Sequence, residues 1–143
     1  MQFHNYKEKV LIIDFGSQVT KLIARRIREL GVYSEIITPK DLTKVKKFYN
    51  IKGLILSGGP STVTANTFQS VPKNIFEKKI PILGICYGLQ LIAKIFGGKI
   101  KSSKKKREFG RATLYKKNTS LLTKDFLNNK RSVWMSHEDA VVK

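Results

Sequence analysis

A single cysteine, Cys86, lies two residues from a glycine on either side, where a short apolar run passes into a helical pattern. This Gly-x-Cys-x-Gly spacing is the cysteine form of a nucleophile elbow, a sharp turn that lifts one side chain above a sheet edge. The sulfur would lie at a helix N-terminus, where the positive end of the helix dipole favours a thiolate. The N–H of Tyr87 would point to where an oxyanion forms in acyl transfer. Most single cysteines are small buried apolar side chains, but the glycines Gly84 and Gly88 favour a catalytic nucleophile.

A second glycine-rich segment, Ser57–Ser61, also follows an apolar run and has the sequence Ser-Gly-Gly-Pro-Ser. By itself it indicates only a tight turn. In a doubly wound sheet, however, the loops after parallel strands meet at one edge, where ligands bind. We therefore expect this loop to lie beside Cys86, with the N–H of Gly59 as a second oxyanion donor.

A cysteine nucleophile usually needs a base, most often a histidine, and the sequence has two histidines. His4 lies in a polar N-terminal segment, which favours a solvated side chain. His137 follows a predicted strand and could face the same edge, so it is the only available base, although the spacing does not prove that role. One cysteine excludes an internal disulfide and a cysteine-cluster zinc site, and we expect no metal.

The elements that must position these residues alternate between strands and helices over the first hundred residues. Short apolar runs rich in β-branched residues predict strands, and apolar residues at helical spacing predict helices. The alternation predicts an α/β fold with a doubly wound, mostly parallel sheet and helices on both faces. We expect Ser17 to cap the first helix and Gly31 to end it. The expected strands are Val10–Phe15, Val32–Thr38, Gly53–Ser57 and Pro81–Ile85, and the expected helices are Gln18–Leu30, Val71–Lys79 and Leu89–Phe96.

The pattern changes after Gly98. The length of 143 residues predicts a single domain, residues 1–143, and an apolar fraction of 41% is enough for a core. The last third is expected to hold a basic, polar stretch at Lys99–Arg107, strands at Arg111–Tyr115 and Arg131–Ser136, and a short helix at Ser120–Leu127.

The chain carries 28 Lys and Arg residues against 10 Asp and Glu residues, a net charge of +18. This charge raises nucleic-acid binding as a hypothesis, with Lys104–Arg107 and Arg25–Arg26 as its best features. The aromatic residues do not interleave with the basic run as a stacking platform requires, so specific nucleic-acid binding is the less favoured alternative. No apolar run approaches the roughly 20 residues of a membrane span, and the N-terminus lacks the apolar core of a signal peptide. We expect a cytoplasmic protein without a membrane partner.

The segment Gly84–Gln90, Gly-Ile-Cys-Tyr-Gly-Leu-Gln, resembles the nucleophile motif of class I glutamine amidotransferases, especially with Ser-Gly-Gly-Pro upstream. Within this class the chain resembles the GMP synthetase family, from about Lys9 to Asp139. A class I amidotransferase that serves another synthetase is an alternative, and Asp14–Gln18 weighs against it. The segments that carry the narrower resemblance are Ile13–Gln18, Glu108–Arg111 and Val133–His137.

The resemblance implies that Cys86 attacks the side-chain amide of glutamine, that ammonia leaves, and that water cleaves the glutamyl thioester. In the family, the equivalent of His137 binds substrate and does not transfer protons. By motif position, the oxyanion N–H groups would come from Gly59 and Tyr87, and the side chains that help to hold glutamine would be Gln90, Ser136 and His137.

The resemblance also implies partners. In the family, the ammonia passes to an ATP-using synthetase domain (the ATP-pyrophosphatase), which adenylates XMP and makes GMP with ATP and Mg. We therefore expect no cofactor in this chain, a synthetase domain in cis or in trans, and a homodimer of the full protein.

The chain departs from the family pattern at its C-terminal end. The catalytic His and Glu of the family lie in a His-Pro-Glu motif past the Ser-His segment, and the 143 residues contain no such motif. A free cysteine is only a few per cent thiolate at neutral pH. We therefore expect an amidotransferase domain incomplete at its C-terminus, unstable and nearly inactive alone. The alternative is a protein that binds glutamine or a partner without hydrolysis. Glu138, where the family often has Gly, could crowd the glutamine.

Overall fold

The computed structural model describes residues 8–102, 108–125, 130–137 and 139–142. These residues fall into two compact units, one within Met1–Ile100 and Val141–Lys143 and the other within Lys101–Ala140. The expectation of a single domain stays a prediction. Three features singled out in the sequence lie outside the described residues, namely His4, Glu138 and the basic run Lys104–Arg107.

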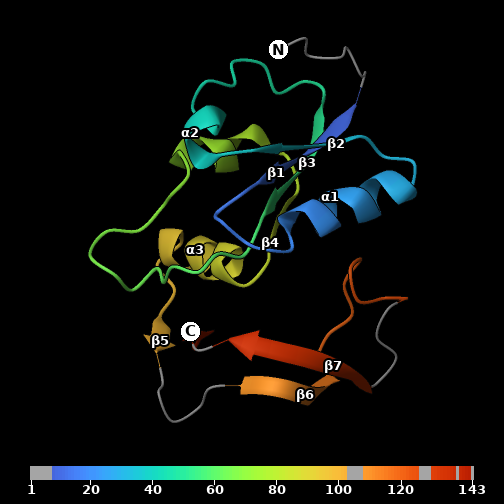
Figure 1. Cartoon of the computed structure of the whole chain (residues 1–143), viewed down its shortest axis with the longest axis vertical. Coiled ribbons are helices and arrows are strands. Elements are labelled where there is room, and N and C mark those ends of the chain that lie inside the picture. The colour runs from blue at the N-terminus through green and yellow to red at the C-terminus, as the bar shows by residue number, and fades with distance from the viewer. Residues whose placement is uncertain (1–7, 103–107, 126–129, 138, 143) are drawn as a thin grey trace. The chain divides into compact units, whose positions relative to one another are not determined.

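The first unit is built on a four-stranded parallel sheet with the strand order β2-β1-β3-β4 (Figure 1). Strand β1 pairs with β3 so that Leu11 faces Leu54 and Ile13 faces Leu56. Each of the four strands predicted from apolar runs is confirmed, with ends that shift by one or two residues. Their bounds are β1 Lys9–Ile13, β2 Ser34–Ile37, β3 Ile51–Leu56 and β4 Ile82–Gly84.

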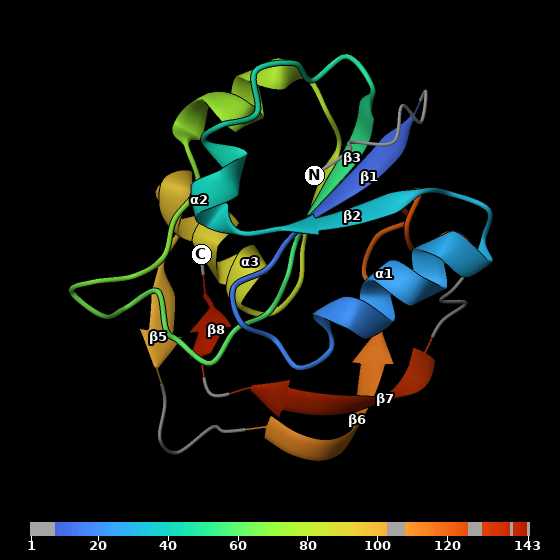
Figure 2. The same cartoon turned by 45° about the horizontal axis from the view of Figure 1, so that its top comes forward.

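The helices of the first unit cover both faces of this sheet. The chain crosses the sheet in one direction from β1 to β2 and in the opposite direction from β2 to β3. Because crossovers between parallel strands are right-handed, α1 and α2 lie on opposite faces (Figure 1, Figure 2). The helices are α1 Thr20–Glu29, α2 Pro39–Leu42, the 3₁₀ helix η1 Lys73–Lys78, and α3 Tyr87–Ile95.

Helix α1 ends before Gly31, as expected, but it begins at Thr20, two residues later than expected. Gly31 has φ +79°, and its N–H donates to the Arg28 carbonyl at 2.9 Å, which is the Schellman pattern of a helix C-terminus. The expected cap, Ser17, is wrong because Val19 precedes the first helical residue and no side chain caps the helix. The Ser17 hydroxyl instead accepts the Val19 N–H at 3.2 Å, so it closes the turn before the helix.

Two other helices differ from expectation. The predicted helix Val71–Lys79 is a six-residue 3₁₀ helix. It starts after Pro72, because the backbone of Pro72 has an extended ψ of 130° and is not helical. Helix α3 begins at Tyr87, two residues before the expected Leu89, so it starts directly after Cys86. The one-turn helix α2 was not predicted, although Pro39 occupies the first helical position that proline favours.

The main core lies on the sheet face that carries α2, η1 and α3. Alternate residues of the strands point to this face, and the helices close it with large apolar side chains that are almost fully buried. The core includes Leu11 and Ile13 of β1, Leu54 and Leu56 of β3, Leu42 of α2, Ile75 of η1, and Tyr87 and Leu91 of α3.

The second unit contains two long antiparallel strands, β6 (Glu108–Tyr115) and β7 (Lys130–His137), paired from end to end. Both predicted strands are confirmed and are longer than expected. Residues 121–125 form a turn, with the Lys124 N–H donating to the Ser120 carbonyl at 2.9 Å, and the rest of the helix expected at Ser120–Leu127 lies outside the described residues.

Two short strands were not predicted, β5 (Ile100–Ser102) and β8 (Asp139–Val141), which pair with each other. Within the described ranges, no helix is long and apolar enough to span a membrane.

Candidate functional site

Cys86 occupies a strained position between β4 and α3. Its backbone has φ 51° and ψ −109°, a combination that costs a residue with a side chain about 1–3 kcal/mol and persists only where the surrounding structure enforces it. Its carbonyl accepts the Gln90 N–H at 3.1 Å, so it begins the hydrogen-bond ladder of α3. Cys86 is exposed. The structure therefore has the strand–turn–helix geometry of the predicted elbow.

The two glycines of the motif have a physical reason in backbone contacts. A Cβ on Gly84 would lie 2.6 Å from the backbone nitrogen of Leu89. A Cβ on Gly88 would lie 2.1 Å from the carbonyl oxygen of Leu56. Any side chain at either position would force α3 away from the sheet and release the turn that holds Cys86.

The loops after β1 and β3 meet at the same edge as the elbow. A Cβ on Gly58 would lie 3.5 Å from the Cys86 Cβ and 3.7 Å from the Ser17 hydroxyl. The fully buried Ser57 links these loops, since its hydroxyl accepts the Phe15 N–H at 3.1 Å and its carbonyl accepts the Gly88 N–H at 3.1 Å. The expected convergence of the glycine loop and Cys86 is confirmed.

Gly59 is packed against the loop that follows β1. A Cβ on Gly59 would lie 2.6 Å from the carbonyl oxygen of Phe15, so the loop backbone rests directly on that residue. The Phe15 ring, 4% exposed, lies 4.9 Å from the Tyr87 ring, centroid to centroid. Phe15 thus connects the backbones that carry the two predicted oxyanion donors, whose roles stay predictions.

Asp14 shapes the loop after β1, a role that sequence reasoning missed. Its carboxylate accepts the Gly16 N–H at 2.9 Å and the Thr20 hydroxyl at 2.8 Å, and Thr20 is 1% exposed. An aspartate that bonds the N–H two residues on forms an Asx-turn. The Asp-x-Gly spacing at the end of an apolar run was the available signal.

The side chain of Tyr87 is buried while its backbone begins α3. Its hydroxyl donates to the Gln69 carbonyl at 2.5 Å, and burial raises the pKa of the Tyr87 phenol above its ordinary value, although this hydrogen bond acts in the opposite direction. The Tyr87 N–H is among the first N–H groups of α3, which have no acceptor inside the helix, and its role as an oxyanion donor stays a prediction. Gln90, 7% exposed, lies one turn farther along α3.

The other predicted substrate residues, Ser136 and His137, belong to the second unit. They end β7, where Ser136 pairs with Phe109 and His137 with Glu108. Ser136 is exposed and His137 is half-buried. Their part in binding glutamine, like that of Gln90, stays a prediction. Across the described part of the chain, no three His, Cys, Asp or Glu side chains gather as a metal site would need.

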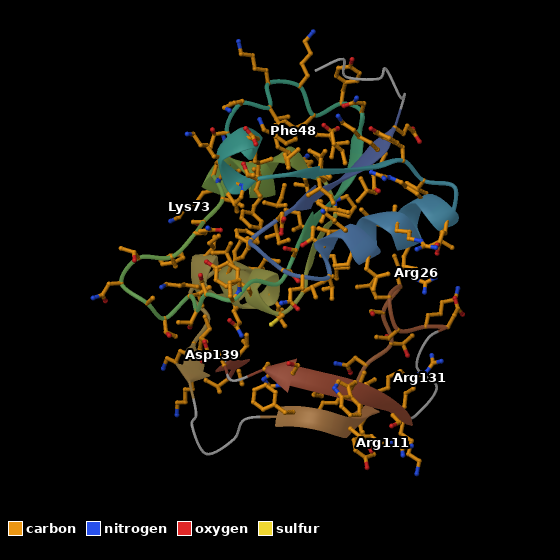
Figure 3. The ribbon with its side chains drawn as sticks, in the orientation of Figure 1. Arg26, Phe48, Lys73, Arg111, Arg131 and Asp139 are labelled. Carbon is orange, nitrogen blue, oxygen red and sulfur yellow. The ribbon has the colours of Figure 1, made fainter. Side chains whose placement is uncertain are left out.

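Arg25, Arg26 and Arg111 lie on outer surfaces. Arg25 and Arg26 of α1 each form an ion pair with Glu29, at 2.9 Å and 2.8 Å, and Figure 3 shows Arg26 on the outside of α1. In the second unit, Arg111 donates to the Ser132 hydroxyl at 2.8 Å, across β6 and β7. These contacts are those of solvated faces, and the nucleic-acid alternative is not favoured.

A family model for class I glutamine amidotransferases matches residues 11–143. The chain belongs to this family. Among its curated relatives, the class I amidotransferase chain is 48% identical over 134 residues to a glutamine-hydrolysing GMP synthase of Borrelia garinii subsp. bavariensis, covering 94% of this chain and 25% of the relative. It is 49% identical over 138 residues to that of Bacillus subtilis, covering 95% of this chain and 26% of the relative. The amidotransferase chain thus spans about a quarter of the length of these relatives.

Solved structures agree with the family and with the predicted fold class. A Thermoplasma acidophilum protein assigned as one subunit of a GMP synthase is 32% identical, with a TM-score of 0.80 over 97% of this chain and 69% of that chain. A glutamine amidotransferase of Methylobacillus flagellatus is 16% identical and shares the fold alone, with a TM-score of 0.67 over 95% of this chain and 57% of that chain.

Proposed function

We propose that this chain is the glutaminase part of a GMP synthase, which hydrolyses glutamine and supplies ammonia for the conversion of XMP to GMP in purine nucleotide biosynthesis. The observation that carries the proposal is the strained, exposed Cys86 between two glycines whose backbones touch their neighbours. Its support is the match of this chain to glutamine-hydrolysing GMP synthases over most of its length.

The proposed chemistry follows from the placement of Cys86. Its sulfur adds to the side-chain carbonyl carbon of glutamine, and the carbonyl oxygen becomes an oxyanion that accepts the N–H groups of Gly59 and Tyr87. The carbon–nitrogen bond then breaks, the nitrogen takes a proton and ammonia leaves, and a glutamyl thioester remains. Water cleaves the thioester, which yields glutamate and returns the thiol. The side chains proposed to hold glutamine are Gln90, Ser136 and His137.

We propose that the catalytic base and the synthetase activity belong to groups outside the 143 residues. In this family the base is a histidine of a His-Pro-Glu motif, which the 143 residues do not contain. We therefore propose that these residues alone release little ammonia. ATP and Mg would serve a synthetase domain, joined in cis or bound in trans, in a cytoplasmic homodimer.

A chloromethyl ketone analogue of glutamine tests the glutamine site without requiring turnover. The Cys86 sulfur attacks its CH₂ carbon, a carbon–sulfur bond forms, chloride leaves, and the thiol proton passes to solvent. We expect alkylation of Cys86 at least tenfold faster than by iodoacetamide, slowed by L-glutamine but not by D-glutamine, and lost in Cys86→Ala. Equal rates for the two reagents, or no protection by L-glutamine, would contradict the proposal.

An ammonia assay tests the assignment of the base. We expect ammonia release by the 143 residues to be indistinguishable from that of Cys86→Ala. Release that disappears in Cys86→Ala would contradict the absence of a base and make His137 the candidate for it. Glutamine protection without release would be the result expected of a site that binds glutamine and lacks its base.

A further inference from the structure

The loop between β3 and η1 is long and lacks regular secondary structure. It runs from residue 57 to residue 72 and contains only turns and bends. Loops longer than about 12–15 residues without secondary structure are uncommon in compact domains and are usually functional when ordered. Gly59 lies at the start of this loop. Residues 64–67 in the middle of the loop are exposed, whereas Val63 is fully buried and Phe68 is half-buried. The loop therefore packs against the rest of the first unit at Val63 and Phe68.

Lys94 of α3 makes both attachments. Its ammonium group donates to the Val63 carbonyl and lies 3.8 Å from the centroid of the Phe68 ring. A lysine over an aromatic face is attracted by the ring quadrupole, and the carbonyl takes one of its three N–H donors. One half-buried side chain thus binds two separate points of the loop.

Tyr87 makes a third attachment from the same helix. Its buried hydroxyl donates to the Gln69 carbonyl at 2.5 Å. Residues seven apart lie two turns apart on one face of a helix, so Tyr87 and Lys94 face the loop together. The two hydrogen bonds end on backbone carbonyls, so they do not depend on the side chains of Val63 and Gln69, whereas the contact with Phe68 needs its ring.

We propose that Tyr87 and Lys94 form a clamp that holds the segment Val63–Gln69 on α3 and thereby keeps Gly59 at the Cys86 elbow. The inference rests on the proposed function for its catalytic meaning. An oxyanion donor acts only when its N–H lies about 2.7–3.1 Å from the reacting oxygen. Gly59 is fixed on one side by Phe15, and the clamp restrains the other side of its loop. Lys94 is a positioning residue, because it touches the loop and not the reacting atoms.

Amide hydrogen exchange tests the clamp independently of activity. We expect Lys94→Met to raise the exchange rate of amides in residues 62–70 at least tenfold, with β1 and β3 unchanged. Lys94→Arg, which keeps a cationic donor, is expected to restore the wild-type rates. Lys21→Met, at an exposed position of α1, is the matched control and should change nothing. Unchanged exchange in residues 62–70 of Lys94→Met would overturn the clamp. Faster exchange throughout the chain would overturn it too, because Lys94 would then stabilise the whole fold and not this loop.

The alkylation of Cys86 tests the effect of the clamp on the site. The ketone oxygen of the glutamine analogue stands in for the amide oxygen, whereas iodoacetamide needs only an exposed thiol. We expect Lys94→Met to lower the rate with the ketone at least fivefold and to leave the rate with iodoacetamide unchanged, and Lys94→Arg to recover most of the loss.

The two failures are distinguishable. A wild-type chain that does not prefer the ketone contradicts the proposed function, and the exchange experiment still decides whether the clamp exists. A wild-type preference that persists undiminished in Lys94→Met contradicts the positioning role of Lys94 alone.

Discussion

A Cβ placed on Gly88 would lie 2.1 Å from the carbonyl oxygen of Leu56, so the first turn of α3 meets strand β3 backbone against backbone. The Gly88 N–H adds a hydrogen bond to the carbonyl of Ser57, at 3.1 Å. The position of Cys86 is therefore determined by the sheet itself, through contacts that no side chain could replace. This explains why the motif needs glycine on the helical side of the nucleophile.

Gly88→Ala is predicted to disrupt the elbow. The new methyl group would overlap the Leu56 carbonyl, and neither backbone can move without breaking the sheet or the helix. We expect a loss of about 3 kcal/mol or more in the free energy of unfolding, measured by urea denaturation. Gly53→Ala is the matched control, because a Cβ there meets only ordinary contacts at 3.8 Å and 3.9 Å. Similar losses in the two variants would contradict the prediction.

Cys86→Gly is predicted to be more stable than Cys86→Ala. Both remove the thiol, but only glycine adopts the positive φ of this position without strain. The strain is about 1–3 kcal/mol, and the greater freedom of glycine in the unfolded chain offsets about 0.5–1 kcal/mol of its release. We expect a net advantage of about 1 kcal/mol for glycine in urea denaturation.

The same pair of substitutions at Arg25, in the middle of α1, is the control for Cys86. There glycine should be about 1 kcal/mol less stable than alanine, because the backbone is helical. If Cys86→Gly were also the less stable of its pair, the conformation of Cys86 would not be strained.

Much of the fold could be predicted because the strands of the parallel sheet are short, continuous apolar runs. Val10–Ile13 and Leu54–Leu56 are such runs, and glycine-rich turns mark where they end. The elements that were missed or misplaced depend on local hydrogen bonds. The start of α1 was misplaced because Ser17 bonds within its turn, and the strand β5 was missed because its sequence, Ile-Lys-Ser, is polar and only three residues long.

The part of the candidate site that could be predicted is the Gly-x-Cys-x-Gly motif, because its glycines are required by close backbone contacts. Gly84, Cys86 and Gly88 required no knowledge of distant residues, and the shared edge of parallel strands brought the glycine loop to them. The supporting residues were not predictable, because their partners are far away in the sequence. The Ser57 hydroxyl bonds Phe15, 42 residues away, and the Lys94 ammonium bonds Val63, 31 residues away.

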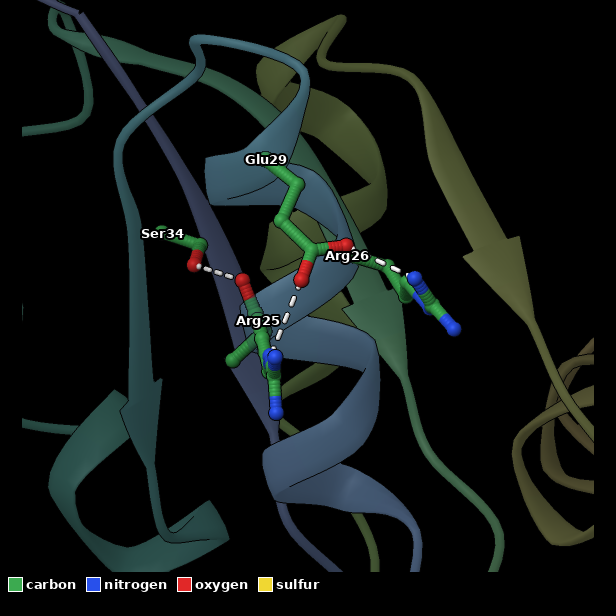
Figure 4. Close-up of polar contacts among 5 residues, drawn as sticks. Arg25, Arg26, Glu29 and Ser34 are labelled. Carbon is green, nitrogen blue, oxygen red and sulfur yellow. Dashed lines mark hydrogen bonds and ion pairs between the residues drawn. The ribbon is translucent and has the colours of Figure 1, made fainter.

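A buried and an exposed polar contact of α1 are predicted to differ in their contribution to the free energy of unfolding. The Ser34 hydroxyl donates to the Ala24 carbonyl at 2.9 Å inside the protein, whereas Arg25 and Arg26 hold Glu29 at the surface (Figure 4). We expect Ser34→Ala to cost about 1 kcal/mol of unfolding free energy. Glu29→Gln should cost less than about 0.5 kcal/mol, because solvent screens exposed ion pairs. Denaturation at low and high salt measures both, and an equal cost at both sites would contradict the distinction.

Tyr87→Phe is predicted to make the chain less stable at neutral pH and to remove part of its loss of stability in alkali. Tyr87 as a residue is 1% exposed, and burial raises the pKa of its phenol above the ordinary value of about 10. Below about pH 10 both the folded and unfolded states keep the proton, and the hydroxyl contributes its hydrogen bond to Gln69, worth about 1 kcal/mol.

Above pH 10 the unfolded state loses its proton first, so the free energy of unfolding falls as pH rises towards the folded pKa. The stability advantage of the wild type over Tyr87→Phe should therefore be constant between pH 7 and pH 9 and shrink above about pH 10. Urea denaturation across this range measures it, with Tyr49→Phe, whose ring is 78% exposed, as the control that should match the wild type. An advantage that stays constant up to pH 11 would show that Tyr87 ionises equally in both states and that its burial does not oppose the charge.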